Sequence, residues 1–266
     1  MKPEFRDLDS NIRKMKSFVD EIMELRPETD LIVFPELSTS GYECTKEEFA
    51  LLAEKIDMDS VSLKSLSESC KKYGVNIVYG LPESDTGIPG VYHNSVVMLG
   101  NDGSLLGSYR KVHPFGGESL WCKAGGEINV IDTPIGKVGL MICWDTAFPE
   151  VARIYALQGA ELLIVSSNWG APYHEDWELV TRARAMDNTL HLVSSNRVGK
   201  DIEFPFYGHS NIISPDGKII ASLDNDSEGL VFAELDLSLT AVLREELYTF
   251  FEDRKPECYG EIVRPL

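Results

Sequence analysis

Stretches with a helical pattern of apolar residues alternate along the chain with stretches that have the pattern of a β-strand. Residues 11–25 place apolar side chains three and four positions apart, which predicts an amphipathic helix, and the short apolar run 31–34 predicts a buried strand. Helical spacing returns in 51–73, which predicts one or two helices. Further strands are predicted at 75–80, 94–99, 104–111, 137–143, 162–167, 190–195 and 230–235, and a hairpin at 209–223. This alternation is typical of a layered α/β domain.

Two of the predicted hairpins resemble each other, which suggests an internal duplication. The run 92–99 leads to a turn at Asp102, and the similar run 207–214 leads to a turn at Asp216, 216 − 102 = 114 residues later. No linker rich in Gly, Ser or Pro separates the two halves. Two such halves would form two sheets packed face to face with helices outside. The alternative is a chance similarity between two Asp-Gly hairpins.

The thiol of Cys143 stands at the end of the predicted strand 137–143. Pro149 and Glu150 then open a helical pattern that continues to Leu157, so the thiol lies at a turn from strand to helix. Hydrolases often display a nucleophile at such a turn, where the next backbone N–H can point at a reacting oxygen. The residues around Cys143 do not match the Gly-x-Ser-x-Gly pattern. A buried structural role is commoner for a single cysteine in an apolar strand.

Glu36 and Lys111 also lie at the ends of predicted strands. The outer crevice at strand ends is the usual place for ligands in α/β folds. A carboxylate, an ammonium and a thiol form a chemically sensible set there. The Lys charge favours a thiolate and an oxyanion, and the carboxylate can take the thiol proton and return it to a leaving group. The ordinary alternatives are a helix cap for Glu36 and a surface charge for Lys111.

The composition is that of a globular protein with a large acidic excess. The 266 residues carry a formal net charge of −18, which argues against nucleic acid or an anionic membrane as the main partner. Five cysteines without close spacing fit a reducing compartment better than a disulfide framework, and no Cys or His pair suggests zinc. The first residues are too polar for a signal peptide and no apolar stretch is long enough to span a bilayer, so we expect a cytoplasmic protein.

Three segments closely resemble, in order, the three motifs of the nitrilase superfamily, the carbon-nitrogen hydrolases. They are LIVFPELSTSGY (31–42), YRKVHPF (109–115) and GLMICWDTAFPE (139–150), and similarity continues through 166–169, 177–188 and 195–199. The resemblance implies that Glu36, Lys111 and Cys143 are the catalytic Glu, Lys and nucleophile of a single domain covering residues 1–266. It also implies an α/β fold built as a four-layer α-β-β-α sandwich, and assembly as a homodimer or higher homo-oligomer.

Further site residues follow from the same resemblance. A second Glu of the family maps onto Glu118, which we expect to position the Lys and the substrate, with Glu127 as the nearby alternative. The residues expected to line the substrate pocket are Tyr42, Trp144, Asn168 and Trp169. For each aromatic side chain the alternative is core packing. His174 and Arg197 are candidates for recognising a substrate carboxylate, with a surface role as the alternative.

The implied reaction is hydrolysis of a C–N bond through a thioester on Cys143. Glu36 accepts the thiol proton as sulfur attacks, while Lys111 and the backbone N–H of Trp144 stabilise the oxyanion. After the amine leaves, water deprotonated by Glu36, or by Glu36 with Glu118, releases the acid. This chemistry requires no metal and no organic cofactor.

The substrate is expected to be a small molecule, and its class is left open by the motifs. Nitrilases often have Cys-Trp-Glu at the nucleophile, whereas Cys143 is followed by Trp-Asp, and 148–150 and 196–199 look more like the amidase and carbamoylase branches. We therefore expect an amidase for small aliphatic or amino-acid-derived amides, ahead of an N-carbamoyl hydrolase and a nitrilase. The alternative from another class is a catalytically silent binding or scaffold protein of the same fold. The joint presence of three reactive residues argues against it.

One departure from the family pattern concerns the N-terminus. Family members begin with a short apolar strand, and residues 1–11 resemble the segment that follows it. The first strand is therefore expected to be missing. A missing central strand would leave unpaired backbone groups and an exposed apolar face, so we expect lower stability than in relatives that have the strand.

Overall fold

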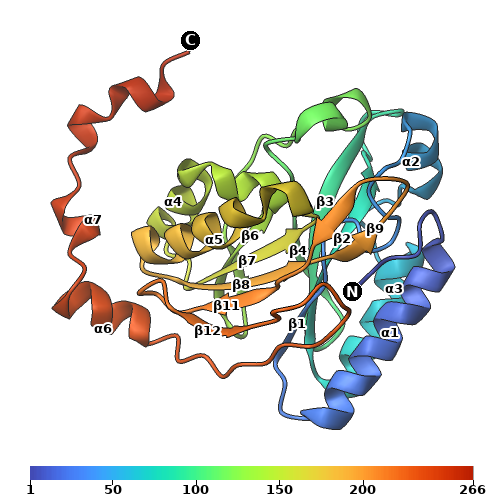
Figure 1. Cartoon of the computed structure of the whole chain (residues 1–266), viewed down its shortest axis with the longest axis horizontal. Coiled ribbons are helices and arrows are strands. Elements are labelled where there is room, and N and C mark those ends of the chain that lie inside the picture. Colours follow the sequence, from blue (N-terminus) through green and yellow to red (C-terminus); the bar gives the residue numbers. More distant parts are fainter. Residues whose placement is uncertain (266) are drawn as a thin grey trace.

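The computed structural model describes residues 1–265 and contains two mixed β-sheets surrounded by helices (Figure 1). The first sheet has four strands in the order β1-β2-β3-β4. Their bounds are Leu31–Val33 for β1, Asn76–Ser84 for β2, Tyr92–Leu99 for β3 and Leu105–Arg110 for β4. β1 and β2 are parallel, and the other neighbours are antiparallel. The first half of the chain therefore forms one sheet.

The second sheet has six strands in the order β12-β11-β8-β7-β6-β5. Their bounds are Ile131–Thr133 for β5, Gly136–Ile142 for β6, Leu162–Ser167 for β7, His191–Asn196 for β8, Asn211–Ile213 for β11 and Ile219–Ser222 for β12. The neighbours β6, β7 and β8 are parallel, whereas β5, β11 and β12 pair antiparallel. A small separate hairpin joins β9 (Val198–Lys200) to β10 (Pro205–Tyr207). The expected α/β class with two sheets is confirmed.

Helices cover the outer faces of both sheets (Figure 1). α1 (Leu8–Leu25) and α3 (Val61–Tyr73) pack side by side against the first sheet, and α4 (Pro149–Leu157) and α5 (His174–Asn188) pack against the second. The short helix α2 (Lys46–Leu52) contacts β2. Apolar side chains of both sheets, among them Val96, Met98, Leu140 and Ile164, form one buried cluster between them.

Local sequence signals explain where the first helices begin. The Asp7 carboxylate accepts a hydrogen bond from the backbone N–H of Ser10 at 2.9 Å and caps α1. α2 begins with a capping box in which the side chains of Thr45 and Glu48 each accept from the other's backbone N–H. These caps satisfy N–H groups that have no partner inside a helix, so the chain can turn sharply into each helix.

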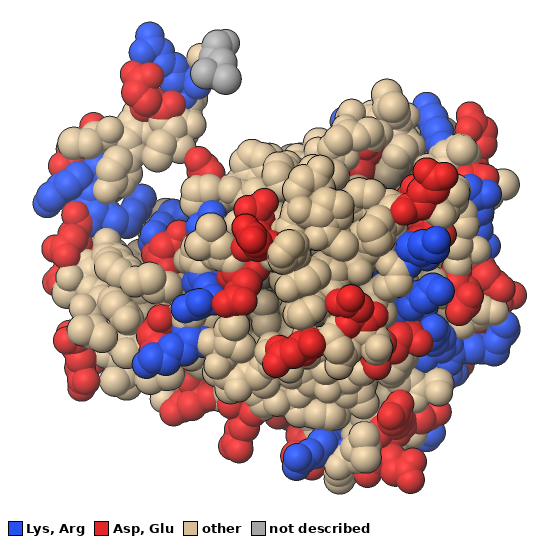
Figure 2. Space-filling view, viewed as in Figure 1, with Lys and Arg blue, Asp and Glu red and all other residues tan. Residues whose placement is uncertain are grey.

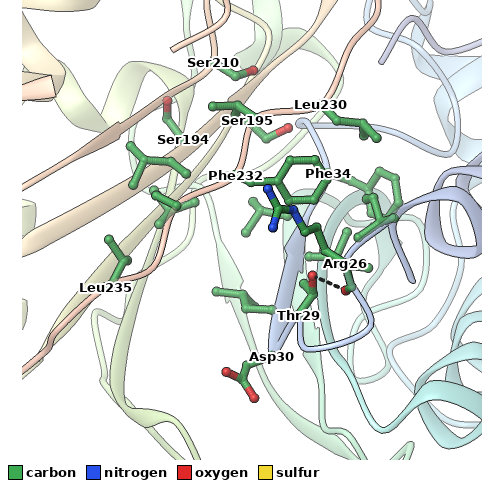
Figure 3. Close-up of a pocket in the computed structure, with 18 of the residues that line it drawn as sticks. Arg26, Thr29, Asp30, Phe34, Ser194, Ser195, Ser210, Leu230, Phe232 and Leu235 are labelled. Carbon is green, nitrogen blue, oxygen red and sulfur yellow. Dashed lines mark hydrogen bonds between the residues drawn. The ribbon is translucent and has the colours of Figure 1, made fainter. Parts of the chain in front are cut away.

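The hairpins predicted at 94–111 and 209–223 are confirmed as β3–β4 and β11–β12. The strand predicted at 230–235 is wrong. This segment is extended but pairs with no strand of residues 1–265. Its apolar composition favours a strand, but a ladder also needs an adjacent backbone partner, and the nearest described elements lie across a groove of about 970 Å³. The groove is lined by β1, by residues 229–235 and by side chains of α1 and β8 (Figure 3).

The C-terminal residues extend away from the sheets (Figure 1). They form α6 (Leu239–Glu246), α7 (Phe250–Asp253) and two 3₁₀ turns, Pro256–Cys258 and Gly260–Val263. None of the helices in residues 1–265 has the length and apolar character needed to cross a membrane. On the face shown in Figure 2, basic side chains are interspersed with acidic ones.

Candidate active site

Three strand ends bring reactive side chains into the space between the two sheets. Glu36 follows β1 by three residues, Lys111 comes directly after β4, and Cys143 comes directly after β6. All three are buried, with at most 6% of the residue exposed. The carboxylate, the ammonium and the thiol therefore meet in a setting from which water is largely excluded, where charges act strongly on one another.

The ammonium of Lys111 is held between two carboxylates. Its Nζ donates to Glu36 Oε1 at 2.8 Å and to Glu118 Oε1 at 2.7 Å. Glu36 Oε1 also accepts from Asn94 Nδ2 at 2.6 Å, and its Oε2 accepts from the backbone N–H of Asn168 at 2.8 Å. Three donors thus orient the Glu36 carboxylate. Asn94 is a partner that the sequence did not reveal as part of the site.

Glu118, and not Glu127, is the second carboxylate beside Lys111. It lies in a 3₁₀ turn, Gly116–Leu120, and its Oε1 also accepts from the hydroxyl of Tyr42 at 2.5 Å. Glu127 is exposed, and its carboxylate accepts from Asn129 Nδ2 at 3.3 Å. The geometry therefore supports Glu118 as the residue that positions the ammonium.

The backbone is strained at Cys143, in the turn that follows β6. Cys143 has φ = +44°, a left-handed conformation that is rare for residues other than glycine. The same conformation recurs at Leu37, next to Glu36, with φ = +46°. Gly80 allows that second turn, because a Cβ there would lie 2.5 Å from the Leu37 nitrogen and 2.7 Å from Glu36 Cα. Strain of this kind persists only where surrounding contacts hold it, and it is frequent at active sites.

The fully buried carboxylate of Asp145 holds the turn at Cys143 against the strand end that carries Lys111. Its Oδ2 accepts from the backbone N–H of Ile142 at 3.2 Å and from the Tyr109 hydroxyl at 2.9 Å. Its Oδ1 accepts from the backbone N–H of His113 at 3.0 Å and faces His113 Nδ1 at 2.9 Å. One side chain thus ties together the segment that carries Cys143 and the segment that carries Lys111.

The electrostatics of the site favour a protonated thiol. Burial raises the pKa of the Cys143 thiol, the charge of Glu36 raises it further, and the charge of Lys111 offsets only part of this. Burial also raises the pKa of Glu36. Burial by itself would lower the pKa of Lys111, but the charges of Glu118 and Glu36 raise it well above its usual value. The resting site therefore holds a thiol, a cationic Lys and a carboxylate that is a stronger base than usual.

A narrow pocket of about 20 Å³ opens above Cys143. All four residues expected to line it do so: Tyr42, Trp144, Asn168 and Trp169. The remaining lining residues, which sequence reasoning missed, are Phe115, Gly170, Tyr173 and Phe204. The aromatic side chains also pack on one another, with the ring centroids of Trp144 and Trp169 5.7 Å apart. These side chains therefore both line the pocket and pack as core residues do. Phe115 could have been proposed from the sequence, because it closes the segment around Lys111.

The side chain of Asn168 contributes an amide group to the wall of this pocket. Its Oδ1 and Nδ2 are both buried, and neither has a hydrogen-bond partner within residues 1–265. A buried amide that lacks partners is costly, unless a ligand supplies them. The pocket wall therefore offers one acceptor and one donor, side by side, next to Cys143.

Neither candidate for carboxylate recognition lines this pocket. Arg197 is fully buried, donates to Asp201 Oδ2 at 2.9 Å and stacks 4.1 Å above the ring of Phe206. His174 begins α5, and its Nδ1 lies 3.2 Å from the carbonyl oxygen of Ala171. The expected surface alternative is wrong for Arg197, whose charge is matched inside the protein.

Two carboxylates fasten the loops on opposite sides of the pocket to each other. Asp201 Oδ2 accepts from the backbone N–H groups of Tyr42 and Glu43, at 2.7 and 3.1 Å. In return, Glu43 Oε2 accepts from the backbone N–H groups of residues 202, 203 and 204, at 2.7 to 3.2 Å. We call this pair the Asp201–Glu43 clasp. It places Tyr42 and Phe204 at the pocket, and no sequence pattern predicts it because the partners are 158 residues or more apart.

The fold is that of a carbon-nitrogen hydrolase, and the chain belongs to that family. The family model described as "Carbon-nitrogen hydrolase" matches residues 1–245. The protein is thus an enzyme of the nitrilase superfamily that acts on C–N bonds other than peptide bonds.

Individual relatives match over nearly their whole length. The chain is 48% identical over 265 residues to a probable nitrilase of Schizosaccharomyces pombe, and the alignment covers 100% of this chain and 97% of that protein. It is 33% identical to a 2-oxoglutaramate amidase of Bacillus subtilis over 92% of both chains. The crystal structure of a carbon-nitrogen hydrolase from Helicobacter pylori superposes with a TM-score of 0.91 at 30% identity, covering 99% of this chain and 96% of the other. The relatives thus include both a protein named a nitrilase and an amidase.

Proposed function

We propose that the enzyme hydrolyses a small, uncharged amide to a carboxylic acid and ammonia through a thioester on Cys143. The observation that supports this most directly is the unpartnered amide of Asn168 in the pocket. A substrate amide supplies an N–H for its Oδ1 and an oxygen for its Nδ2. A nitrile has no N–H and would leave Oδ1 buried without a partner, which disfavours a nitrilase.

The neutrality of the pocket supports an uncharged substrate. Of the residues within 1–265 that line it, none has a side chain with a formal charge. The nearby positive charge of Lys111 is already paired with two carboxylates, those of Glu36 and Glu118. A substrate carboxylate would therefore be buried without a partner, which is strongly unfavourable. This favours small aliphatic amides over the amino-acid-derived amides that the motifs also allow.

The first half of the reaction forms the thioester. The Cys143 sulfur attacks the amide carbon while Glu36 takes the thiol proton, so that no free thiolate has to form beforehand. Lys111 and the backbone N–H of Trp144 stabilise the negative charge that develops on the amide oxygen. The proton on Glu36 then passes to the nitrogen, the C–N bond breaks and ammonia leaves.

The second half releases the acid. A water molecule attacks the thioester carbon, and Glu36, oriented by Asn94 and by the backbone of Asn168, takes its proton. The C–S bond breaks, the acid leaves, and the proton returns to Cys143. Glu118 touches the ammonium of Lys111 throughout and keeps it in position. Glu36, Lys111 and Cys143 form the proposed catalytic triad.

Ammonia release from a panel of compounds tests this function. The panel contains aliphatic amides, the corresponding nitriles, N-carbamoyl compounds and the carboxylate-bearing 2-oxoglutaramate. We expect the aliphatic amides to be hydrolysed fastest and Cys143→Ala to be inactive. Asn168→Ala should lose amide hydrolysis while still reacting with a small thiol reagent.

Other outcomes of the panel would contradict the proposal. Faster hydrolysis of nitriles or carbamoyl compounds would move the substrate to another class, and a preference for 2-oxoglutaramate would refute the uncharged pocket. Activity that survives in Cys143→Ala would refute the nucleophile. A wild-type protein inert to every compound and to a thiol-directed probe would support a scaffold protein instead.

We also propose the remaining features that the family resemblance implies. The placement of helices outside two sheets that contact each other supports a four-layer α-β-β-α order within a single domain (Figure 1). The exposed apolar residues Leu247, Ile262 and Val263 on the C-terminal extension support contact with a second copy in a homodimer or larger homo-oligomer.

A further inference from the structure

We propose that the ring of Phe204, which packs against Gly170, limits the size of the acyl group that can reach Cys143 and restricts the enzyme to amides of short-chain acids. Phe204 and Gly170 both line the pocket above Cys143. This limit presupposes the amide hydrolysis proposed above and adds what the pocket excludes. Phe204 thereby becomes a residue that determines specificity.

The free space above Cys143 is small. Its volume of about 20 Å³ is close to that of one water-sized group, since a single water needs roughly 10–15 Å³ on the same measure. A primary amide group, with its carbon, oxygen and nitrogen atoms, fills such a space by itself. Each further carbon of an acyl chain therefore has to displace atoms of the wall.

Parts of the wall are fixed by hydrogen bonds of their own. Trp169 is buried, and it donates from its backbone N–H to Asn196 Oδ1 and from its ring Nε1 to the carbonyl oxygen of Tyr173, both at 2.7 Å. Phe204 differs, because it lies in the connection between β9 and β10, a hairpin that belongs to neither large sheet. The position of this wall residue is therefore decided by what holds the hairpin.

Gly170 allows the ring of Phe204 to lie where it does. The backbone of Gly170 has φ = −74° and ψ = 143°, an extended conformation that any residue adopts, so the chain does not need a glycine there for its own turn. A Cβ on Gly170 would lie 2.4 Å from Phe204 Cζ and 2.6 Å from its Cε1, far inside van der Waals contact. The tip of the ring thus occupies the space that a side chain at position 170 would need.

The backbone around Phe204 is held on both sides. Its N–H donates to Glu43 Oε2 at 3.2 Å, as part of the Asp201–Glu43 clasp. Two residues further on, Phe206 forms an antiparallel bridge with Gly170, and the rings of Phe204 and Phe206 pack with their centroids 5.4 Å apart. The clasp therefore helps to fix the size limit through the backbone of Phe204.

Kinetics with amides of increasing chain length test this limit. In the wild type we expect kcat/KM to fall at least about tenfold between propionamide and hexanamide, because a filled pocket has no room for further methylene groups. Phe204→Ala removes the ring and should bring the values for the two amides to within about threefold of each other.

The contact between the ring and Gly170 is tested without any substrate. In Gly170→Ala the new methyl group collides with the ring, so we expect a lower melting temperature than in the wild type. The same substitution made in Phe204→Ala should cost much less, because the ring is gone. The difference between the two shifts measures the coupling of the two residues.

A variant outside the pocket tests the role of the clasp. Glu43→Ala removes the carboxylate that accepts from the backbone N–H of Phe204, so the ring should move more freely. We expect the ratio of kcat/KM for hexanamide to that for propionamide to rise at least about threefold. Glu203→Ala removes the same charge from an exposed side chain of the same loop and should leave this ratio unchanged. A general loss of stability would lower both rates without favouring the longer amide.

Alkylation of Cys143 separates the size limit from the proposed reaction. Iodoacetamide and its N-hexyl derivative have the same reactive carbon, and mass spectrometry distinguishes labelling of Cys143 from labelling of the exposed Cys258. Relative to a free thiol, the wild type should react at least about tenfold faster with the smaller reagent, and Phe204→Ala should lose most of this difference. A protein that hydrolyses no amide but keeps this difference would refute the proposed function and retain the size limit.

Three results would overturn the size limit. Equal rates with the short and the long compounds in the wild type would show that the wall does not restrict the acyl group. An unchanged preference in Phe204→Ala would show that other residues set it. Equal melting shifts from Gly170→Ala with and without the ring would show that the ring does not pack against Gly170.

Discussion

The charged side chains around Cys143 decide where the proton of its thiol resides. Two carboxylates and one ammonium surround the thiol, so the charges of Glu36 and Glu118 outweigh that of Lys111. A positive residue beside a cysteine usually favours the thiolate, and the sequence led us to expect that effect here. Burial and the charge of Glu36 reverse the balance and raise the pKa of the Cys143 thiol. In the proposed mechanism, proton transfer to Glu36 therefore accompanies the attack of sulfur.

This arrangement predicts an acid limit on activity that lies above the usual range of a carboxyl group. Burial raises the pKa of Glu36 from 4.5, and below that raised pKa the carboxyl holds a proton and cannot act as a base. We expect kcat/KM to fall as the pH drops through a value above 4.5. Lys111, whose pKa is raised, should stay charged to at least its ordinary 10.5. A pH profile of kcat/KM measures both limits, and an acid limb centred at or below 4.5 would contradict the first.

Replacing the base while keeping its shape should remove activity. In Glu36→Gln the side chain can still accept from Asn94, but it cannot take a proton, so we expect kcat to fall by about 100- to 10,000-fold. Glu127→Gln makes the same chemical change at an exposed position and serves as the control. Steady-state kinetics of the two variants decide the assignment. Equal losses in both would show that Glu36 is not the base.

At the scale of secondary-structure elements, the ends of β1, β4 and β6 position the three residues of the proposed triad. The apolar runs that end at Glu36, Lys111 and Cys143 were predictable, because β-strands have a strong local pattern and the motifs occur in family order. Contacts between distant segments were not predictable. The Asp201–Glu43 clasp and the orientation of Glu36 by Asn94 join residues 58 to 161 positions apart. The wrong prediction of a strand at 230–235 has the same origin. A strand forms only beside a backbone partner, and the local sequence does not show whether that partner is present.

Asp145 should support catalysis by holding two elements in register. Asp145→Asn keeps the volume but turns one acceptor oxygen into a donor that faces other donors, so we expect a loss of about 1–3 kcal/mol in the free energy of unfolding. The turn at Cys143 should also loosen, which lowers kcat with little change in KM. Urea unfolding and kinetics measure the two effects. Asp132→Asn, at a side chain that is 83% exposed, is the control and should change neither.

At the scale of the whole molecule, the C-terminal extension, which begins with α6, contacts the rest of the protein near Phe251 and exposes apolar side chains near its end. The guanidinium groups of Arg153 and Arg244 lie 4.9 and 4.3 Å from the centre of the Phe251 ring. Further along, Ile262 and Val263 are 61% and 84% exposed. Exposed apolar residues on an extension that leaves the body of the protein are typical of contacts between subunits.

This predicts a homodimer, or a larger assembly, that depends on the extension. Light scattering of the purified protein should give at least twice the chain mass. The double variant Ile262→Ser, Val263→Ser should shift the mass toward one chain as concentration falls, whereas Glu257→Gln, also exposed on the extension, should not. A wild-type protein with the mass of one chain at all concentrations would contradict the prediction.

The sharing of one ammonium by two carboxylates has a consequence for chemical labelling. With both carboxylates ionised, the three groups sum to −1 + 1 − 1 = −1 around the thiol. Aromatic walls keep this charge from being screened by salt. Neutral iodoacetamide should therefore alkylate Cys143 at least about tenfold faster, relative to a free thiol, than anionic iodoacetate. The ratio of the two alkylation rates would therefore report the sign of the charge in this buried site without any substrate.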